Sequence, residues 1–318
     1  MNKAEASLKG RDILDLASLT LKERELILET AGKMKDILNR DMKKEPLLRG
    51  KSIITLFYEA STRTRTSFEL AGKYLGADVV NIAVASSSVS KGESLRDTLY
   101  TLQAMKTDAI IMRHPVEGAA DYAAKALDAV VINAGDGQRA HPTQALLDLF
   151  TIKRHKKNFS DLKIAILGDI RHSRVARSNI VGFREFGAEV RIAGPRPLIP
   201  AEIEKLGVVV CDRIEDAIAE ADVIYVLRIQ LERQKVGFFP TTREYSRIFG
   251  LKERHLKLAK PDVLVMHPGP VNRGLEISPD VMYGDKSLIE EQVENGVAVR
   301  MAILYLTLTD GEHLEFAN

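Results

Sequence analysis

The apolar residues of this chain gather in short runs that are separated by longer amphipathic stretches. The runs are rich in β-branched residues and apolar almost throughout, as strands buried on both faces are. Between them, apolar residues recur at helical spacing. Strands that alternate with helices predict βαβ units and parallel sheets. The expected strands are Ser52–Phe57, Asp78–Ala83, Ala109–Met112, Ala129–Asn133, Lys163–Leu167, Glu189–Ala193, Val208–Cys211, Val223–Leu227 and Val263–Met266.

These strands form two sets, which predicts an α/β fold with two domains, each a parallel sheet flanked by helices. A helix that starts at Pro142 and runs to Arg154 is expected to join the halves, because proline suits the first helical position. After Pro279 the pattern is helical through Tyr283–Glu294 and Val297–Leu308.

The first helix has clear start and stop signals. Thr20 and Glu23 fit a capping box, and apolar residues then recur at helical spacing to Leu38. The charged stretch Arg40–Glu45 is expected to be a solvated helix end, and Pro46 stops the pattern.

Composition narrows the class of protein. The chain has 318 residues, 45% of them apolar, with 46 Lys+Arg against 44 Asp+Glu and a formal net charge of +2. The apolar content argues against a disordered chain, and the near-zero net charge argues against a mainly electrostatic nucleic-acid binder. No apolar run suits a membrane helix, and the N-terminus lacks the apolar segment of a signal peptide. We therefore expect a cytoplasmic protein without membrane or nucleic-acid partners.

The single cysteine, Cys211, excludes an intramolecular disulfide and a cysteine-cluster metal site. A catalytic thiol stays open, but the apolar run around Cys211 favours a buried strand residue.

The strongest chemical signal is the segment Ser61–Phe68, which reads Ser-Thr-Arg-Thr-Arg-Thr-Ser-Phe. It lies between the strand Ser52–Phe57 and a helical pattern over Phe68–Leu75, so we expect a strand-to-helix turn at the ligand-binding edge of a sheet. Hydroxyls and guanidiniums alternate there beside helix N-terminal amides, which suits a phosphate group. The glycines and lysine of a P-loop are missing. The plain alternative is a capped helix with surface arginines.

Two further segments follow expected strands in the first half. Arg113-His114-Pro115 comes directly after one strand, and the glycine-containing turn Asn133–Gly137 after the next. That turn leads to His141-Pro142-Thr143-Gln144, where a helix is expected to begin. A lone histidine is more often structural, but this position at the ligand edge favours a functional His141.

The second half repeats this arrangement. Gly168 follows a strand, but a dinucleotide site needs G-x-G-x-x-G, so a nucleotide-binding module is disfavoured. Arg174, Arg228 and Gln230 follow strands and are expected to converge on one crevice. Two arginines suit a ligand with two carboxylates, whereas Arg228 alone would pass as a surface charge.

Taken together, Ser61–Phe68, Arg113–Pro115, His141–Gln144 and His267–Pro270 resemble the aspartate/ornithine carbamoyltransferase superfamily over nearly the whole chain. The Arg228-Ile229-Gln230 segment matches the Arg-x-Gln with which aspartate-using members hold their substrate. The His-Cys-Leu-Pro and Ser-Met-Gly segments of ornithine-using members are missing.

The resemblance implies a carbamoyl-phosphate-binding domain over residues 1–143 and an aspartate-binding domain over residues 144–295. It also implies that the C-terminal helix, residues 296–318, packs back on the first domain.

The resemblance further implies the site residues. Those expected to bind carbamoyl phosphate are Ser61, Thr62, Arg63, Thr64, Ser87, Lys91, Arg113, His141, Gln144, Pro268 and Gly269. Catalytic roles fall to Arg63, Thr64, Lys91, Arg113 and His141. Those expected to bind aspartate are Lys91, Arg174, Arg228 and Gln230. Pro268 and Gly269 match a loop whose backbone contacts both substrates, and many relatives have Leu in place of Gly269.

The implied reaction is transfer of the carbamoyl group of carbamoyl phosphate to the amino group of L-aspartate, a step of de novo pyrimidine biosynthesis. It needs no cofactor and no metal. The resemblance implies a homotrimer with shared sites, in which Lys91 and Ser87 reach a neighbouring subunit. Regulatory chains or a dihydroorotase remain open as further partners. The alternatives are carbamoylation of another amino acid such as ornithine, and a catalytically silent anion-binding partner subunit.

Overall fold

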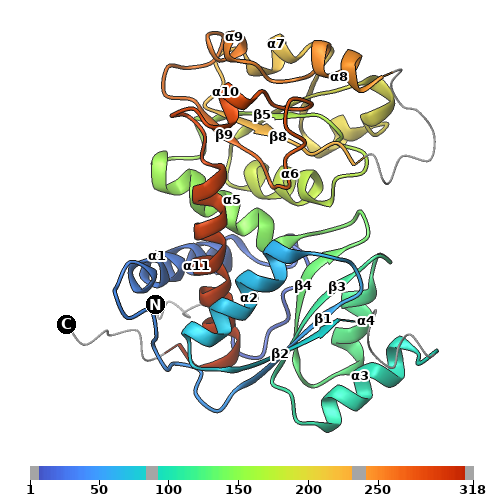
Figure 1. Ribbon diagram of the computed structural model, residues 1–318, viewed down its shortest axis with the longest axis vertical. Helices are drawn as coiled ribbons and strands as arrows, with labels where there is room; N and C mark the ends of the chain where they lie inside the picture. Colours follow the sequence, from blue (N-terminus) through green and yellow to red (C-terminus); the bar gives the residue numbers. More distant parts are fainter. Residues whose placement is uncertain (1–6, 84–91, 231–240, 312–318) are drawn as a thin grey trace, which may run out of the picture. The chain divides into compact units, whose positions relative to one another are not determined.

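The structure is a computed structural model, and it describes residues 7–83, 92–230 and 241–311. The chain divides into two compact units, residues 1–150 with 294–318 and residues 151–293, each built on its own parallel sheet (Figure 1). The division falls inside helix α5, Pro142–His155. The domain limits expected from the sequence, at residues 143 and 295, stay a prediction for the domains as functional parts.

The first unit contains a four-stranded sheet with the strand order β2-β1-β3-β4, and all its strands are parallel. The strands are β1 Ser52–Phe57, β2 Asp78–Ala83, β3 Ala109–His114 and β4 Val130–Asp136. The helices of this unit are α1 Leu21–Leu38, α2 Thr62–Tyr74, α3 Leu95–Ala104, α4 Ala119–Ala126, most of α5, and most of α11 Ile289–Leu308.

Alternate residues of the first sheet face opposite helix layers, as strand geometry requires. One face, with Ile54, Leu56, Ile110 and Met112, packs on apolar residues of α3 and α4. Ile53 faces the other way and contacts α2, since a Cβ added at Gly72 would lie 3.3 Å from its Cδ1. The capping box expected at the start of α1 is present: Thr20 and Glu23 cap each other's backbone.

The C-terminal helix belongs to the first unit, as expected from the sequence. Lys35 of α1 forms an ion pair with Glu294 of α11 at 2.7 Å. Near the other end of α11, the Thr307 carbonyl accepts a hydrogen bond from the Gly10 amide at 2.9 Å. Among the described residues, no helix combines the length and the apolar composition that a membrane span requires.

One helix expectation was wrong over its first half and confirmed from Ile289 onward. The pattern predicted helix over Tyr283–Glu294, but the structure has the short helix α10, Pro279–Met282, and then irregular chain until α11 begins at Ile289. The backbone there pairs with a strand instead: the Val265 amide donates to Lys286, and the Leu288 amide donates to Val265, each at 2.8 Å. These bonds use donors and acceptors that a helix would need.

The second unit contains a five-stranded parallel sheet with the order β7-β6-β5-β8-β9. The strands are β5 Lys163–Leu167, β6 Glu189–Ala193, β7 Val209–Cys211, β8 Val223–Val226 and β9 Leu264–Met266. The helices are α6 Arg174–Glu185, α7 Ile214–Ile218, α8 Thr242–Ile248, α9 Glu253–Leu256 and α10, with 3-10 turns at Arg196–Leu198 and Ile203–Leu206.

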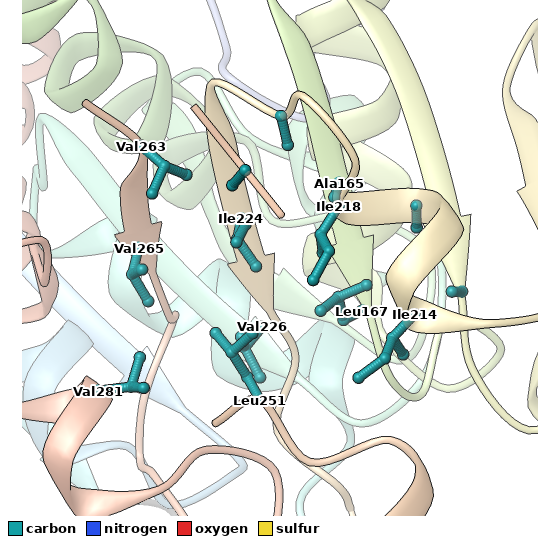
Figure 2. Close-up of a cluster of buried hydrophobic side chains, with 14 of the residues drawn as sticks. Ala165, Leu167, Ile214, Ile218, Ile224, Val226, Leu251, Val263, Val265 and Val281 are labelled. Carbon is teal, nitrogen blue, oxygen red and sulfur yellow. The ribbon is translucent and has the colours of Figure 1, made fainter. Parts of the chain in front are cut away.

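Figure 2 shows the core on one face of this sheet: Leu167 lies beside Ile214 and Ile218 of α7, while Val265 of β9 lies further along the sheet, on the side of Val281. Helix α6 covers the other face, with the Phe183 ring edge-on to Tyr225 at 6.5 Å. All nine expected strands are therefore present, and β3 and β4 run further than expected, to His114 and Asp136.

Candidate functional site

The first candidate site lies where the connections of the first sheet diverge. The chain leaves β1 toward β2 on one side and leaves β3 toward β4 on the other. Such switch points, at the carboxyl ends of parallel strands, are where open α/β sheets bind ligands. Here Ser61–Thr64 follows β1, and Arg113 lies near the end of β3. Phe57 and Arg113 are paired in register, and the Tyr58 amide donates to the Arg113 carbonyl at 2.9 Å.

The N-terminus of α2 has the features that favour an anion. The helix begins at Thr62, earlier than the pattern from Phe68 indicated, so the hydroxyl and arginine residues occupy its first turns. Ser61 is the N-cap with extended backbone, and its side chain makes no capping bond. The first turn has no acidic residue. First-turn amides have no partner within the helix and attract negative charge.

Arg113 is held in place by groups on both sides. Its Nε lies 3.3 Å from a carboxylate oxygen of Glu59, and its Nη1 donates to the Ala134 carbonyl at 3.4 Å. The guanidinium is largely buried, so these contacts fix its direction. Sequence reasoning missed Glu59; the only sequence signal is its place in the same β1–α2 turn as the anion-binding segment.

The neighbouring His114 has a structural role in the described residues. Its ring packs on Tyr58 at 4.5 Å between centroids, and its Nδ1 accepts a hydrogen bond from the Val116 amide at 3.0 Å. Burial lowers the pKa of His114 below its usual value of 6.5, although nearby Glu59 and Asp136 oppose the shift. The ring is therefore neutral at pH 7.

His141 and Gln144 follow β4, the neighbour of β3. Both are buried, and the His141 carbonyl accepts the amides of Gln144 and Ala145, which starts helix α5. The turn before them is organised by Asp136, whose carboxylate accepts from the Asn133 side chain at 3.0 Å and the Ala140 amide at 3.2 Å. The first sheet thus brings Arg113, His141 and the start of α2 to one edge.

The second unit has a corresponding switch point between β5 and β8. Arg174 is buried as the first residue of α6, after β5, and Arg228 follows β8 partly buried. Gln230 donates from Nε2 to the His172 carbonyl at 3.3 Å, which joins the two loops. His172 is itself fixed, because its Nδ1 lies 2.9 Å from Asp169.

The loop after β9, which contains Pro268 and Gly269, is attached to the same edge. The Gly269 amide donates to His267 Nδ1 at 2.8 Å, and His267 Nε2 lies 3.3 Å from the buried Glu276. Asn272 donates to the Ile229 carbonyl in the β8 loop at 3.0 Å. Gly269 has φ +60°, a conformation that favours glycine. Three neighbouring strands of one sheet, β5, β8 and β9, are therefore followed by Arg174, by Arg228 with Gln230, and by this loop.

The presence of glycine at position 168, after β5, has a structural explanation that involves no dinucleotide site. Gly168 has φ +120°, and its carbonyl lies so close to Gly194 at the end of β6 that no Cβ would fit there. These glycines allow the ends of two strands to approach each other.

The remaining residues singled out from the sequence are Cys211, Lys91 and Ser87. Cys211 lies on β7 as expected but is only partly buried, and burial raises the pKa of its thiol. Lys91 and Ser87 lie outside the described residues. Within the described ranges, no cluster of three or more His, Cys, Asp or Glu could hold a metal ion.

Comparisons with known proteins agree with this geometry. Residues 11–154 match the model of the aspartate/ornithine carbamoyltransferase carbamoyl-P binding domain, and residues 160–307 match that of the Asp/Orn binding domain. The aspartate carbamoyltransferase catalytic subunit of Pelotomaculum thermopropionicum is 59% identical over 302 residues, which cover 95% of this chain and 97% of the relative.

Solved structures give the same answer at lower identity. Aspartate transcarbamoylase from Trypanosoma cruzi, in complex with carbamoyl aspartate and phosphate, has a TM-score of 0.85 and 31% identity, covering 96% of this chain and 98% of that chain. Ornithine carbamoyltransferase from Pyrococcus furiosus has a TM-score of 0.84 and 32% identity, covering 95% and 98%. The chain belongs to the aspartate/ornithine carbamoyltransferase family.

Proposed function

We propose that this chain is an aspartate carbamoyltransferase, which converts carbamoyl phosphate and L-aspartate to N-carbamoyl-L-aspartate and phosphate in de novo pyrimidine biosynthesis. The observation that carries the proposal is the pair of arginines, Arg174 and Arg228, at the switch point of the second sheet. Relatives at about 59% identity that bear this name support it.

Carbamoyl phosphate is assigned to the first unit. The phosphate lies at the N-terminus of α2, where Ser61, Thr62, Arg63 and Thr64 supply hydroxyl, amide and guanidinium donors. Arg113, His141 and Gln144 bind the carbamoyl end. The Trypanosoma cruzi enzyme, solved in complex with carbamoyl phosphate, has the same fold.

Aspartate is assigned to the second unit. Arg174 and Arg228 match its two carboxylates, and Gln230 adds a donor whose position is set by the His172 carbonyl. A cationic ornithine side chain would be repelled by the same two arginines, which disfavours that substrate.

The proposed chemistry is direct transfer. The neutral α-amino nitrogen of aspartate attacks the carbamoyl carbon and forms the C–N bond. The carbonyl oxygen becomes an oxyanion, which Thr64, Arg113 and His141 stabilise by hydrogen bonds. The C–O bond to phosphate then breaks, and the departing phosphate accepts the amine proton. His141 acts as a hydrogen-bond donor, and holding the reactants together supplies much of the acceleration.

The assembly belongs to the same proposal. We expect a cytoplasmic homotrimer in which Lys91 and Ser87 complete the phosphate site of a neighbouring chain, and Lys91 also contacts aspartate. Pro268 and Gly269 contact both substrates through their backbone, which His267 and Glu276 hold in place.

The test is an assay of the purified protein with carbamoyl phosphate and either aspartate or ornithine, measuring the ureido product. Aspartate should be the preferred acceptor. Arg228→Ala should raise the KM for aspartate at least tenfold, because charge-assisted hydrogen bonds of about 1.5–3 kcal/mol each are lost. The exposed Arg196→Ala is the matched control and should leave that KM unchanged. Preference for ornithine would reject the substrate, and no turnover with either would favour a silent anion-binding subunit.

A further inference from the structure

The side-chain amide of Gln144 has a defined direction. Its Nε2 donates to Asp148 Oδ1 at 3.1 Å, one turn further along α5. Gln144 is 8% exposed and Asp148 is fully buried. A carboxylate only accepts hydrogen bonds, so it takes the NH₂ end of the amide and turns the oxygen end away.

The oxygen of Gln144 remains available to a ligand. Among the described residues no donor reaches Oε1. The atom is not one of the fully buried polar atoms that lack a partner, so a ligand can reach it. An amide oxygen has two acceptor sites and no proton to donate. A group that binds there must therefore present an N–H or O–H.

Asp148 acts electrostatically on Arg300 of α11, which is also buried. Burial lowers the pKa of Arg300 to about 10, and the negative charge of Asp148 opposes that shift, so the guanidinium stays charged at neutral pH. Gly296 leaves room for it, since a Cβ there would lie 2.5 Å from Nη1. The guanidinium also lies over the Phe68 ring of α2, 5.1 Å from its centroid.

We propose that Asp148 is a positioning residue that fixes the Gln144 amide with its oxygen toward the carbamoyl end of the substrate, so that the site selects an acyl phosphate carrying NH₂. The proposal rests on the proposed function, because it takes Gln144 to lie at the carbamoyl end. Acetyl phosphate is the matching test ligand, since it replaces that NH₂ with a methyl group of similar size and leaves the phosphate unchanged.

The site distinguishes carbamoyl phosphate from acetyl phosphate because only the former can donate a hydrogen bond to Gln144 Oε1. With acetyl phosphate bound, Oε1 faces a methyl group and loses its hydrogen bond to water without replacement, which disfavours binding. If the acceptor at Asp148 becomes an amide, it can donate to Gln144 instead, and the Gln144 amide can reverse. The NH₂ of Gln144 would then face the ligand, where it accepts no hydrogen bond and so favours neither the carbamoyl NH₂ nor the acetyl methyl group.

The experiment measures the ratio of the inhibition constant of acetyl phosphate to the KM of carbamoyl phosphate, with inorganic phosphate as a third ligand. Asp148→Asn should lower this ratio about tenfold or more while the inhibition constant of inorganic phosphate changes little. Because Arg300 then lacks its counter-charge, Asp148→Asn/Arg300→Met, which removes both buried charges, tests the same point if the single variant fails to fold.

Asp222→Asn is the control, because Asp222 is a buried carboxylate of the second unit that binds Lys260 at 2.8 Å. It should lower stability without moving the ratio. An unchanged ratio in folded Asp148→Asn, with a ratio that does fall in Gln144→Ala, would overturn the positioning role and leave the proposed function intact. An unchanged ratio in Gln144→Ala would instead remove Gln144 from the carbamoyl end and reject the positioning role with it, whereas the proposed function is rejected only by the acceptor assay.

Discussion

At the residue scale, neighbouring positions in one motif have different tasks. The sequence Arg113-His114-Pro115 lies at the proposed ligand-binding edge of the first sheet, and Glu59 holds Arg113 at the switch point. His114 alternates away from it, stacks on Tyr58 and accepts the Val116 amide. Because side chains alternate along a strand, Arg113 is a candidate ligand-binding residue while His114 is structural. The motif alone does not distinguish the two.

His114 gives a pH-dependent prediction. Its pKa lies below 6.5 when folded because burial disfavours the charged ring, so the unfolded chain binds the proton more readily. The free energy of unfolding should be unaffected by His114 above pH 6.5 and should fall as the pH drops from 6.5 through the folded pKa. His114→Asn keeps an acceptor for the Val116 amide but cannot titrate, so it should flatten this part of the profile.

The measurement combines urea unfolding between pH 5 and 7.5 with NMR titration of the His114 ring. A titration midpoint at or above 6.5, or an identical pH profile in the variant, would contradict the assignment.

At the element scale, the position of α2 depends on one small residue. A Cβ at Gly72 would lie 2.5 Å from Val79 Cγ2, so the helix contacts β1 and β2 more closely than any side chain would allow. Gly72→Ala should destabilise the protein by about 1–3 kcal/mol, the usual cost of overpacking. Because the proposed phosphate site lies at the N-terminus of α2, the KM for carbamoyl phosphate should rise as well.

Two variants make this test specific. Gly72→Ala/Val79→Ala removes the clashing methyl groups and should recover part of both losses. Gly32→Ala in α1, where nothing lies within 4 Å of an added Cβ, should be neutral or stabilising by up to about 1 kcal/mol. Equal effects of Gly72→Ala and Gly32→Ala on unfolding in urea would show that helix propensity, and not contact with the sheet, decides the outcome.

At the scale of the whole molecule, local sequence patterns predicted the helices and strands, but they could not predict contacts between segments far apart in the chain. Short β-branched runs located all the strands, and the residues after them pointed to the two sheet edges where the proposed sites lie. The failure over Tyr283–Leu288 arose because that segment bonds to Val265 of β9, a tertiary contact without a local signal. The interaction of Asp148 with Arg300 was likewise unpredictable, because it depends on where α11 returns.

The last prediction concerns a site shared between chains. Lys91 lies outside the described residues, in the polar segment before α3, and the family resemblance assigns it to a neighbouring subunit. Lys91→Ala and His141→Ala should each be nearly inactive alone. After the two variants are dissociated, mixed in equal amounts and reassembled, about a quarter of the sites in a head-to-tail ring should combine an intact His141 with an intact Lys91. Activity should therefore return to roughly a quarter of the wild-type value, whereas a site built within one chain would leave every mixed assembly inactive. Mass spectrometry of the assemblies would show that hybrids had formed, so that inactivity of confirmed hybrids would count against sharing.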